Sequence, residues 1–187
     1  MQPRINSDLF SSKQKELQQI VGNLNIKDVK EDEQFEKTTQ RVKNSILLKP
    51  VTFQEPTIKG HYQTEKSFPP NYQNMWGGSR QINVITVEFK FEGSPELFAY
   101  SPNGLSFGSS SNMRVFQPDY GNSITVDVEL ATLDKNAALS TAKGQMEMTF
   151  GVINGNNQQI QQWNQSIEAA IENALAAKRK ELIEFYG

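Results

Sequence analysis

Glu88 and Lys90 carry the strongest hint of catalytic chemistry in the sequence. Two residues apart on a predicted strand, their side chains point to the same face. A carboxylate and an ammonium group in that arrangement form half of a nuclease metal site, where the carboxylate holds Mg²⁺ and the lysine steadies the attacking water. The other half is an aspartate on a neighbouring strand, but the nearest upstream aspartate is Asp32, in a predicted helix. We therefore favour a solvent-facing ion pair and keep a small metal-dependent nuclease or hydrolase as the alternative.

Other catalytic side chains are scarce. The sequence has no cysteine, which excludes disulfides, thiol nucleophiles and cysteine-bearing zinc sites. Its single histidine, His61, could act as a general base, but no serine or aspartate stands at a motif spacing from it. We interpret His61 as a histidine of a surface loop. The sequence predicts no catalytic residue, no metal and no cofactor, and hence a protein that is not an enzyme.

The charge balance limits the classes of partner. Nineteen Lys and Arg stand against 21 Asp and Glu in 187 residues, a net charge of −2, which argues against a strongly basic nucleic-acid binder. A local basic patch remains open at Lys178, Arg179 and Lys180, the one run of three basic residues. Cations are also favoured near helix C-termini for purely local reasons. Nucleic acid is therefore expected only indirectly or through this patch.

Apolar runs are short. None approaches the 18 or so residues that a membrane-spanning helix needs, the mean hydropathy is −0.59, and the first 17 residues have no signal-type apolar segment. We predict a cytoplasmic protein without a membrane partner, and the absence of cysteine fits a reducing compartment.

The elements that must position these side chains form an α+β fold: N-terminal helices, a small antiparallel β-meander sheet of four to six strands, and a long C-terminal helix. We predict one domain over 1–187. It has a helical part (1–49), a connector rich in Pro and Gly with a short strand or two (50–80), the sheet (81–131) and the helix (134–186). Strands are expected around Val87–Phe91, at Leu97–Tyr100 and at Ser123–Leu130.

Residues 144–152 fit two patterns. Alternation of Met146, Met148, Phe150 and Val152 suggests a strand. A heptad repeat that contains Leu139 and ends at Ile171 indicates a helix, even though Gly144 and Gly151 each cost a helix about 1 kcal/mol. We favour one helix from about Lys135 into the 180s, capped by Asp134.

Function is predicted to reside on this helix. Its apolar stripe, with Asn157 and Asn164 at core-type positions, resembles a coiled coil in which asparagines fix the register of an oligomer. We predict a recognition or oligomerisation module, with the aromatic loop Phe68–Trp76 as a second binding face, and we expect Ile160→Asp to dissociate an oligomer. The candidate partner-binding residues are Ile153, Ile160, Trp163, Asn164, Ile167, Ile171, Lys178, Arg179 and Lys180.

The order of features over about residues 81–185 carries a resemblance. A strand ending in Phe-Lys-Phe-Glu-Gly-Ser-Pro-Glu-Leu-Phe (89–98) leads to Tyr-Ser-Pro-Asn-Gly (100–104), and a long helix carries Trp-Asn-Gln-Ser-Ile (163–167) and Ala-Lys-Arg-Lys-Glu-Leu (177–182). This resembles the amino-terminal region of uncharacterised bacterial proteins that continue into a restriction-endonuclease-like domain. The present sequence stops at Gly187 without a nuclease. The resemblance therefore implies the non-catalytic half, or a separately encoded version of it, acting as a sensor or assembly module in defence against foreign DNA.

Overall fold

The computed structural model describes residues 3–68, 78–102, 115–119 and 121–186. Their contacts divide the chain into two compact units, where we had predicted one domain. Each unit is assembled from separate stretches of sequence. Unit 1 comprises Met1–Val51, Ala99–Phe107 and Ile153–Gly187, and unit 2 comprises Thr52–Phe98 and Gly108–Val152.

Unit 1 is helical. A π-helical turn, η1 (Ile5–Phe10), leads into α1 (Ser11–Gly22), and a short α2 (Ile26–Val29) precedes α3 (Asp32–Ile46). Asn25 starts α2 because its side chain accepts from the Lys27 amide at 3.0 Å, while Asp28 accepts from the Asn25 amide at 3.0 Å. α2 ends at Val29 and α3 begins at Asp32, so two helices follow Asn25.

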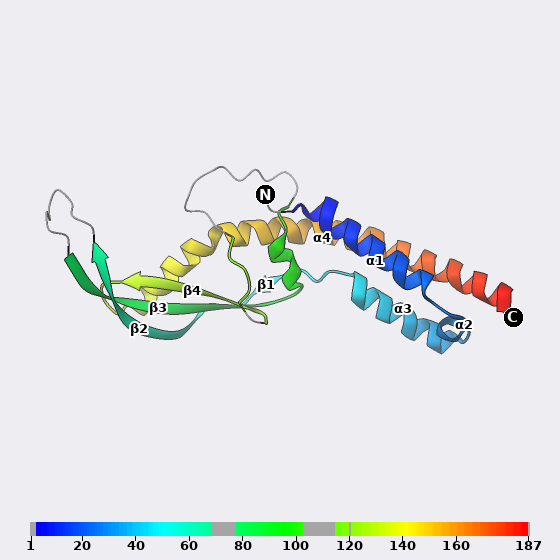
Figure 1. The fold of residues 1–187 in the computed structure, drawn as a ribbon, viewed down its shortest axis with the longest axis horizontal. Helices are drawn as coiled ribbons and strands as arrows, with labels where there is room; N and C mark the ends of the chain where they lie inside the picture. Colours follow the sequence, from blue (N-terminus) through cyan, green and yellow to red (C-terminus); the bar gives the residue numbers. More distant parts are fainter. Residues whose placement is uncertain (1–2, 69–77, 103–114, 120, 187) are drawn as a thin grey trace. The chain divides into compact units, whose positions relative to one another are not determined.

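The core of unit 1 forms where α1 and α3 run beside the later part of α4 (Lys135–Tyr186), as Figure 1 shows. Each helix contributes one apolar stripe, as amphipathic helices do. The buried apolar residues of this core include Ile5, Leu9, Leu17, Val42, Ile46, Ile160, Ile171 and Leu175.

Unit 2 is built on an antiparallel sheet of four strands, β1 (Thr52–Phe53), β2 (Thr57–Phe68), β3 (Gly78–Glu92) and β4 (Ser123–Leu130). β3 is central and pairs with the other three. Its alternating side chains bury Val87, Phe89 and Phe91 on one face. The early part of α4 covers that face: Phe150 packs edge-on against Phe53 at 4.9 Å and against Phe89 at 5.9 Å between ring centroids.

The long helix is confirmed. Asp134 accepts from the Ala137 amide at 3.0 Å, and α4 continues for 52 residues through Gly144 and Gly151, so residues 144–152 are helix and not strand. With the N-terminal helices and the small antiparallel sheet, the α+β fold class is confirmed as well.

Two details differ from the prediction. The connector 50–80 contains β1 and a 12-residue strand, β2, longer than the short strands expected there. Leu97–Tyr100 does not form a strand, because Pro95 opens a 3₁₀ helix, η2 (Pro95–Ala99), which buries Leu97 and Phe98. Residues 69–76 of the proposed aromatic binding loop Phe68–Trp76 lie outside the described residues. None of the described helices is both long and apolar enough to cross a membrane.

Candidate functional site

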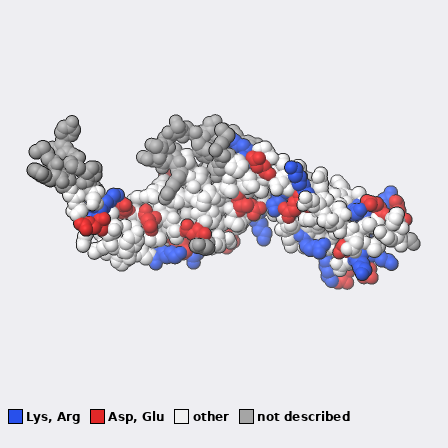
Figure 2. Space-filling view, in the orientation of Figure 1, with Lys and Arg blue, Asp and Glu red and all other residues white. Residues whose placement is uncertain are grey.

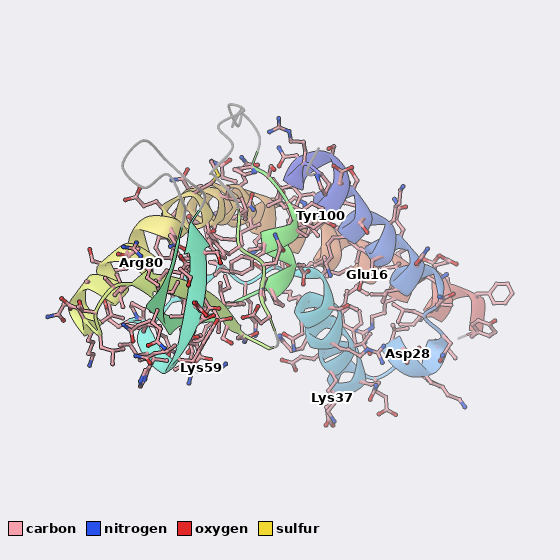
Figure 3. The ribbon with its side chains drawn as sticks, turned by 60° about the vertical axis from the view of Figure 1, so that its left-hand side comes forward. Glu16, Asp28, Lys37, Lys59, Arg80 and Tyr100 are labelled. Carbon is pink, nitrogen blue, oxygen red and sulfur yellow. The ribbon has the colours of Figure 1, made fainter. Side chains whose placement is uncertain are left out.

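Glu88 and Lys90 share one face of β3, as predicted, at 3.8 Å between Lys90 Nζ and Glu88 Oε2. A second lysine, Lys59 of β2 (labelled in Figure 3), lies 3.3 Å from Glu88 Oε1. In the register of the sheet, Glu88 lies opposite Thr57 and Thr125. Each oxygen of the Glu88 carboxylate therefore lies near a lysine ammonium group. This arrangement is typical of a cluster of ion pairs at the surface.

The partners that a metal site would need are not gathered here. Among the described residues, no group of three His, Cys, Asp or Glu could hold a metal ion. Asp127 of β4 lies opposite Thr86 and accepts from its hydroxyl at 2.6 Å. His61 lies in β2 opposite Ile85, exposed, and not in a loop as we had interpreted it.

The apolar stripe of α4 is covered by the chain itself. Ile153, Ile160, Ile167 and Ile171 are each at most 4% exposed, and Trp163 is 8% exposed. The Trp163 ring stacks on Phe10, with centroids 4.7 Å apart and planes 9° apart. These five residues are core residues of unit 1, so we withdraw the interpretation that they form a free partner-binding surface. Helices of the same chain take the place expected for a second copy.

Two asparagines seven residues apart on α4 bind an extended segment of unit 1. Asn164 donates to the Leu48 carbonyl at 2.7 Å and accepts from the Leu48 amide at 3.2 Å. Asn157 does the same with Val51, at 2.8 and 2.9 Å. Seven residues of helix rise by about 10 Å, and three residues of extended chain span about 10 Å, so the two spacings match. The asparagines do fix a register, but that of an intramolecular contact.

The basic run is bound within unit 1 as well. Arg179 reaches Asp32 Oδ1 at 2.5 Å and the Lys30 carbonyl at 3.3 Å, and its guanidinium lies 4.6 Å from the centre of the Phe35 ring. Lys178 pairs with Glu181 at 2.8 Å and Lys180 with Glu184 at 3.8 Å. In Figure 2, basic and acidic side chains alternate over the described surface in view, and no continuous basic patch forms there. The run therefore anchors the start of α3 more than it offers a phosphate site.

Lys43 of α3 is held by two carboxylates of α4. Its Nζ lies 2.8 Å from Glu168 and 2.6 Å from Glu172. The hydrogen bond to Glu168, followed by that to Glu172, raises the pKa of the Lys43 ammonium above its ordinary value. This fork joins two helices of unit 1, so we assign it a structural role.

The last turns of α4 carry an exposed apolar patch, which we call the terminal patch: Ile183, Phe185 and Tyr186 are 40%, 78% and 65% exposed. The Phe185 and Tyr186 rings touch edge-on at 4.7 Å. They border a shallow pocket with Ala177, Lys180 and Glu184 in its lining. Sequence reasoning missed this patch because it followed the heptad series only as far as Ile171, although Phe185 stands two heptads further on. The signal was there as three large apolar residues, Ile183, Phe185 and Tyr186, within four positions.

Comparisons with protein-family models, with curated proteins and with solved structures found no match to this chain.

Proposed function

We propose that this chain is a non-catalytic recognition and assembly module that contacts a protein through the terminal patch, a second copy of the chain being the first partner to test. The exposure of Ile183, Phe185 and Tyr186 carries the proposal. Aromatic side chains are enriched in protein interfaces and supply much of the binding energy there. A cluster of them in water is therefore costly unless a partner covers it.

The surroundings of the patch support a contact of this kind. Lys180 pairs with Glu184 and Lys178 with Glu181 on the adjoining turns, which leaves charges of both signs around an apolar centre. Apolar centres with polar rims are usual in protein interfaces. The proposal moves the contact from the predicted stripe to the end of the same helix.

The resemblance adds a setting to the proposal. It suggests the sensor or assembly part of a bacterial anti-phage or restriction-like system, working in the cytoplasm. A chain without cysteine fits a reducing compartment.

Sedimentation velocity over a range of protein concentrations tests the contact. We expect the wild-type chain to exceed the monomer mass as concentration rises, and Ile183→Ser/Phe185→Ser to remain a monomer with unchanged helix content. Leu133→Ser is the matched control, since Leu133 is 58% exposed in unit 2, and it should associate like the wild type. A wild-type chain that stays monomeric at every concentration would rule out self-association.

The alternative is a small metal-dependent nuclease or hydrolase that uses Glu88 and Lys90. Their common face on β3 is the feature that this chemistry needs, whereas the ion pairs of Glu88 with Lys59 and Lys90 count against it. It requires Mg²⁺-dependent cleavage of nucleic acid that is lost in Glu88→Gln and kept in Glu92→Gln, a substitution on the same strand. Equal activity in the two variants, or none in the wild type, would remove this alternative.

A further inference from the structure

One window of α4 is poorly suited to be a helix. Residues 151–157 read Gly-Val-Ile-Asn-Gly-Asn-Asn, all of them residues with weak helix propensity. Packing does not explain Gly151, because a methyl group added there would meet no atom within 4 Å. The preceding and following turns are richer in strong helix formers such as Ala, Met, Glu and Gln.

The boundary between the two compact units falls inside this window, between Val152 and Ile153. Tertiary packing supplies most of the stability of a protein helix. Here that packing changes from the sheet of unit 2 to the helices of unit 1. The part of α4 with the weakest helix propensity is therefore also the part where its packing partners change from one unit to the other.

The other described crossings between units are tied to the same place within unit 1. The chain crosses after Val51 and before Ala99. Asn157 holds the amide and the carbonyl of Val51 at 2.9 and 2.8 Å, and the adjacent Asn156 donates to the Tyr100 carbonyl at 2.9 Å. Tyr100 is labelled in Figure 3. The three segments of unit 1 that lead to these crossings are therefore hydrogen-bonded to one another within unit 1, and a bend of α4 beyond them leaves these bonds intact.

We propose that α4 is a hinged helix. It bends at the boundary between Val152 and Ile153, next to the Asn156 and Asn157 contacts that stay within unit 1, and the orientation of unit 2 changes with the bend. This device does not depend on the terminal patch or on any partner. It gives the chain two or more orientations of the sheet while each unit keeps its own core.

Distances between paired spin labels measure the bend directly, and the absence of native cysteine makes the labelling specific. The test pair is Gln145→Cys with Ala169→Cys, both exposed on α4 and on opposite sides of the window, about 36 Å apart in a straight helix. The control pair is Gln158→Cys with Lys180→Cys, both exposed in unit 1 and about 33 Å apart. We expect a broader distance distribution for the test pair than for the control pair.

Matched substitutions then locate the hinge. Gly151→Ala/Asn154→Ala replaces two exposed poor helix formers inside the window and should narrow the test-pair distribution towards the width of the control. Thr141→Ala/Gly144→Ala makes a similar change at the same spacing inside unit 2. It should leave the width of the test-pair distance distribution unchanged. A test pair as narrow as the control pair, or equal narrowing by both double variants, would overturn the proposal.

Discussion

At the scale of single residues, two half-buried amide side chains do in this molecule what a strand partner does in a sheet. Asn157 and Asn164 each offer one donor and one acceptor to a backbone residue that has no helix or sheet partner of its own. Leu48 and Val51 are 2% and 3% exposed, so water does not readily replace these bonds. The two asparagines thus let an extended segment enter the core of unit 1.

We predict that Asn164→Ala lowers the free energy of unfolding by roughly 2–3 kcal/mol, because it leaves the amide and the carbonyl of Leu48 buried without their partner. Urea denaturation followed by circular dichroism measures the loss. Asn154→Ala is the control on the same helix, since Asn154 is exposed, and it should not lower stability. Equal stabilities of the two variants would show that the Asn164 bonds contribute nothing.

We predict a stability change at high pH that depends on Lys43. Its pKa is raised in the folded state, so the stabilisation is complete below its unfolded value of about 10.5 and is lost as pH rises through the folded value. The difference in unfolding free energy between wild type and Lys43→Met should therefore shrink above about pH 10.5. The control is Lys37→Met, which removes an ion pair with Glu33 whose lysine is 64% exposed. The unfolding free energy of this variant should differ less from that of the wild type at every pH. A difference that is constant with pH would contradict the role given to the ammonium group.

At the scale of elements, the periodicity of apolar residues predicted a helix or strand correctly where one face of that element is buried. The heptad positions and the Asp134 cap predict α4, and the alternation in Ser123–Leu130 predicts β4. β2 gave little signal because it is an edge strand, mostly exposed and largely polar, so its side chains have no reason to alternate. At η2 the propensity of Leu97 and Phe98 for a strand is overridden by Pro95 and by the burial of both side chains.

The stripe of α4 shows a different limit. Periodicity placed Ile153, Ile160 and Ile167 on one apolar stripe, and each is at most 4% exposed. It could not say what covers them, because a helix of the same chain and a helix of a second copy present the same kind of surface to the stripe. The exposed end of the helix was missed because the heptad series was followed only as far as Ile171.

At the scale of the whole molecule, the two units interleave along the sequence, and among the described α-helices α4 is the one that belongs to both. Each unit has a core of its own, with Ile160 fully buried in one and Phe89 1% exposed in the other. A destabilising substitution in one core therefore tests whether the two units unfold separately or together.

We predict that Ile160→Asp unfolds unit 1 instead of dissociating an oligomer, because an unpaired carboxylate at a fully buried site costs more than about 4 kcal/mol. Hydrogen exchange should show protection lost in α1 and α3 and retained in β3 and β4. The control is Thr141→Asp, a change at an exposed position of the same helix, which should leave both units protected. Equal loss of protection in both units would mean that they unfold as one.

The interleaving also governs the order in which the molecule can be completed during synthesis. The helices α1 and α3 are made early, but the part of α4 that covers their apolar faces follows α3 by about 100 residues. At 5–20 residues per second the ribosome needs roughly 5–20 s to supply it. Unit 2 can finish its sheet and the early turns of α4 during that delay. The nascent chain thus carries the uncovered amphipathic helices α1 and α3 during that delay, a state in which a chaperone has both the time and the surface to bind.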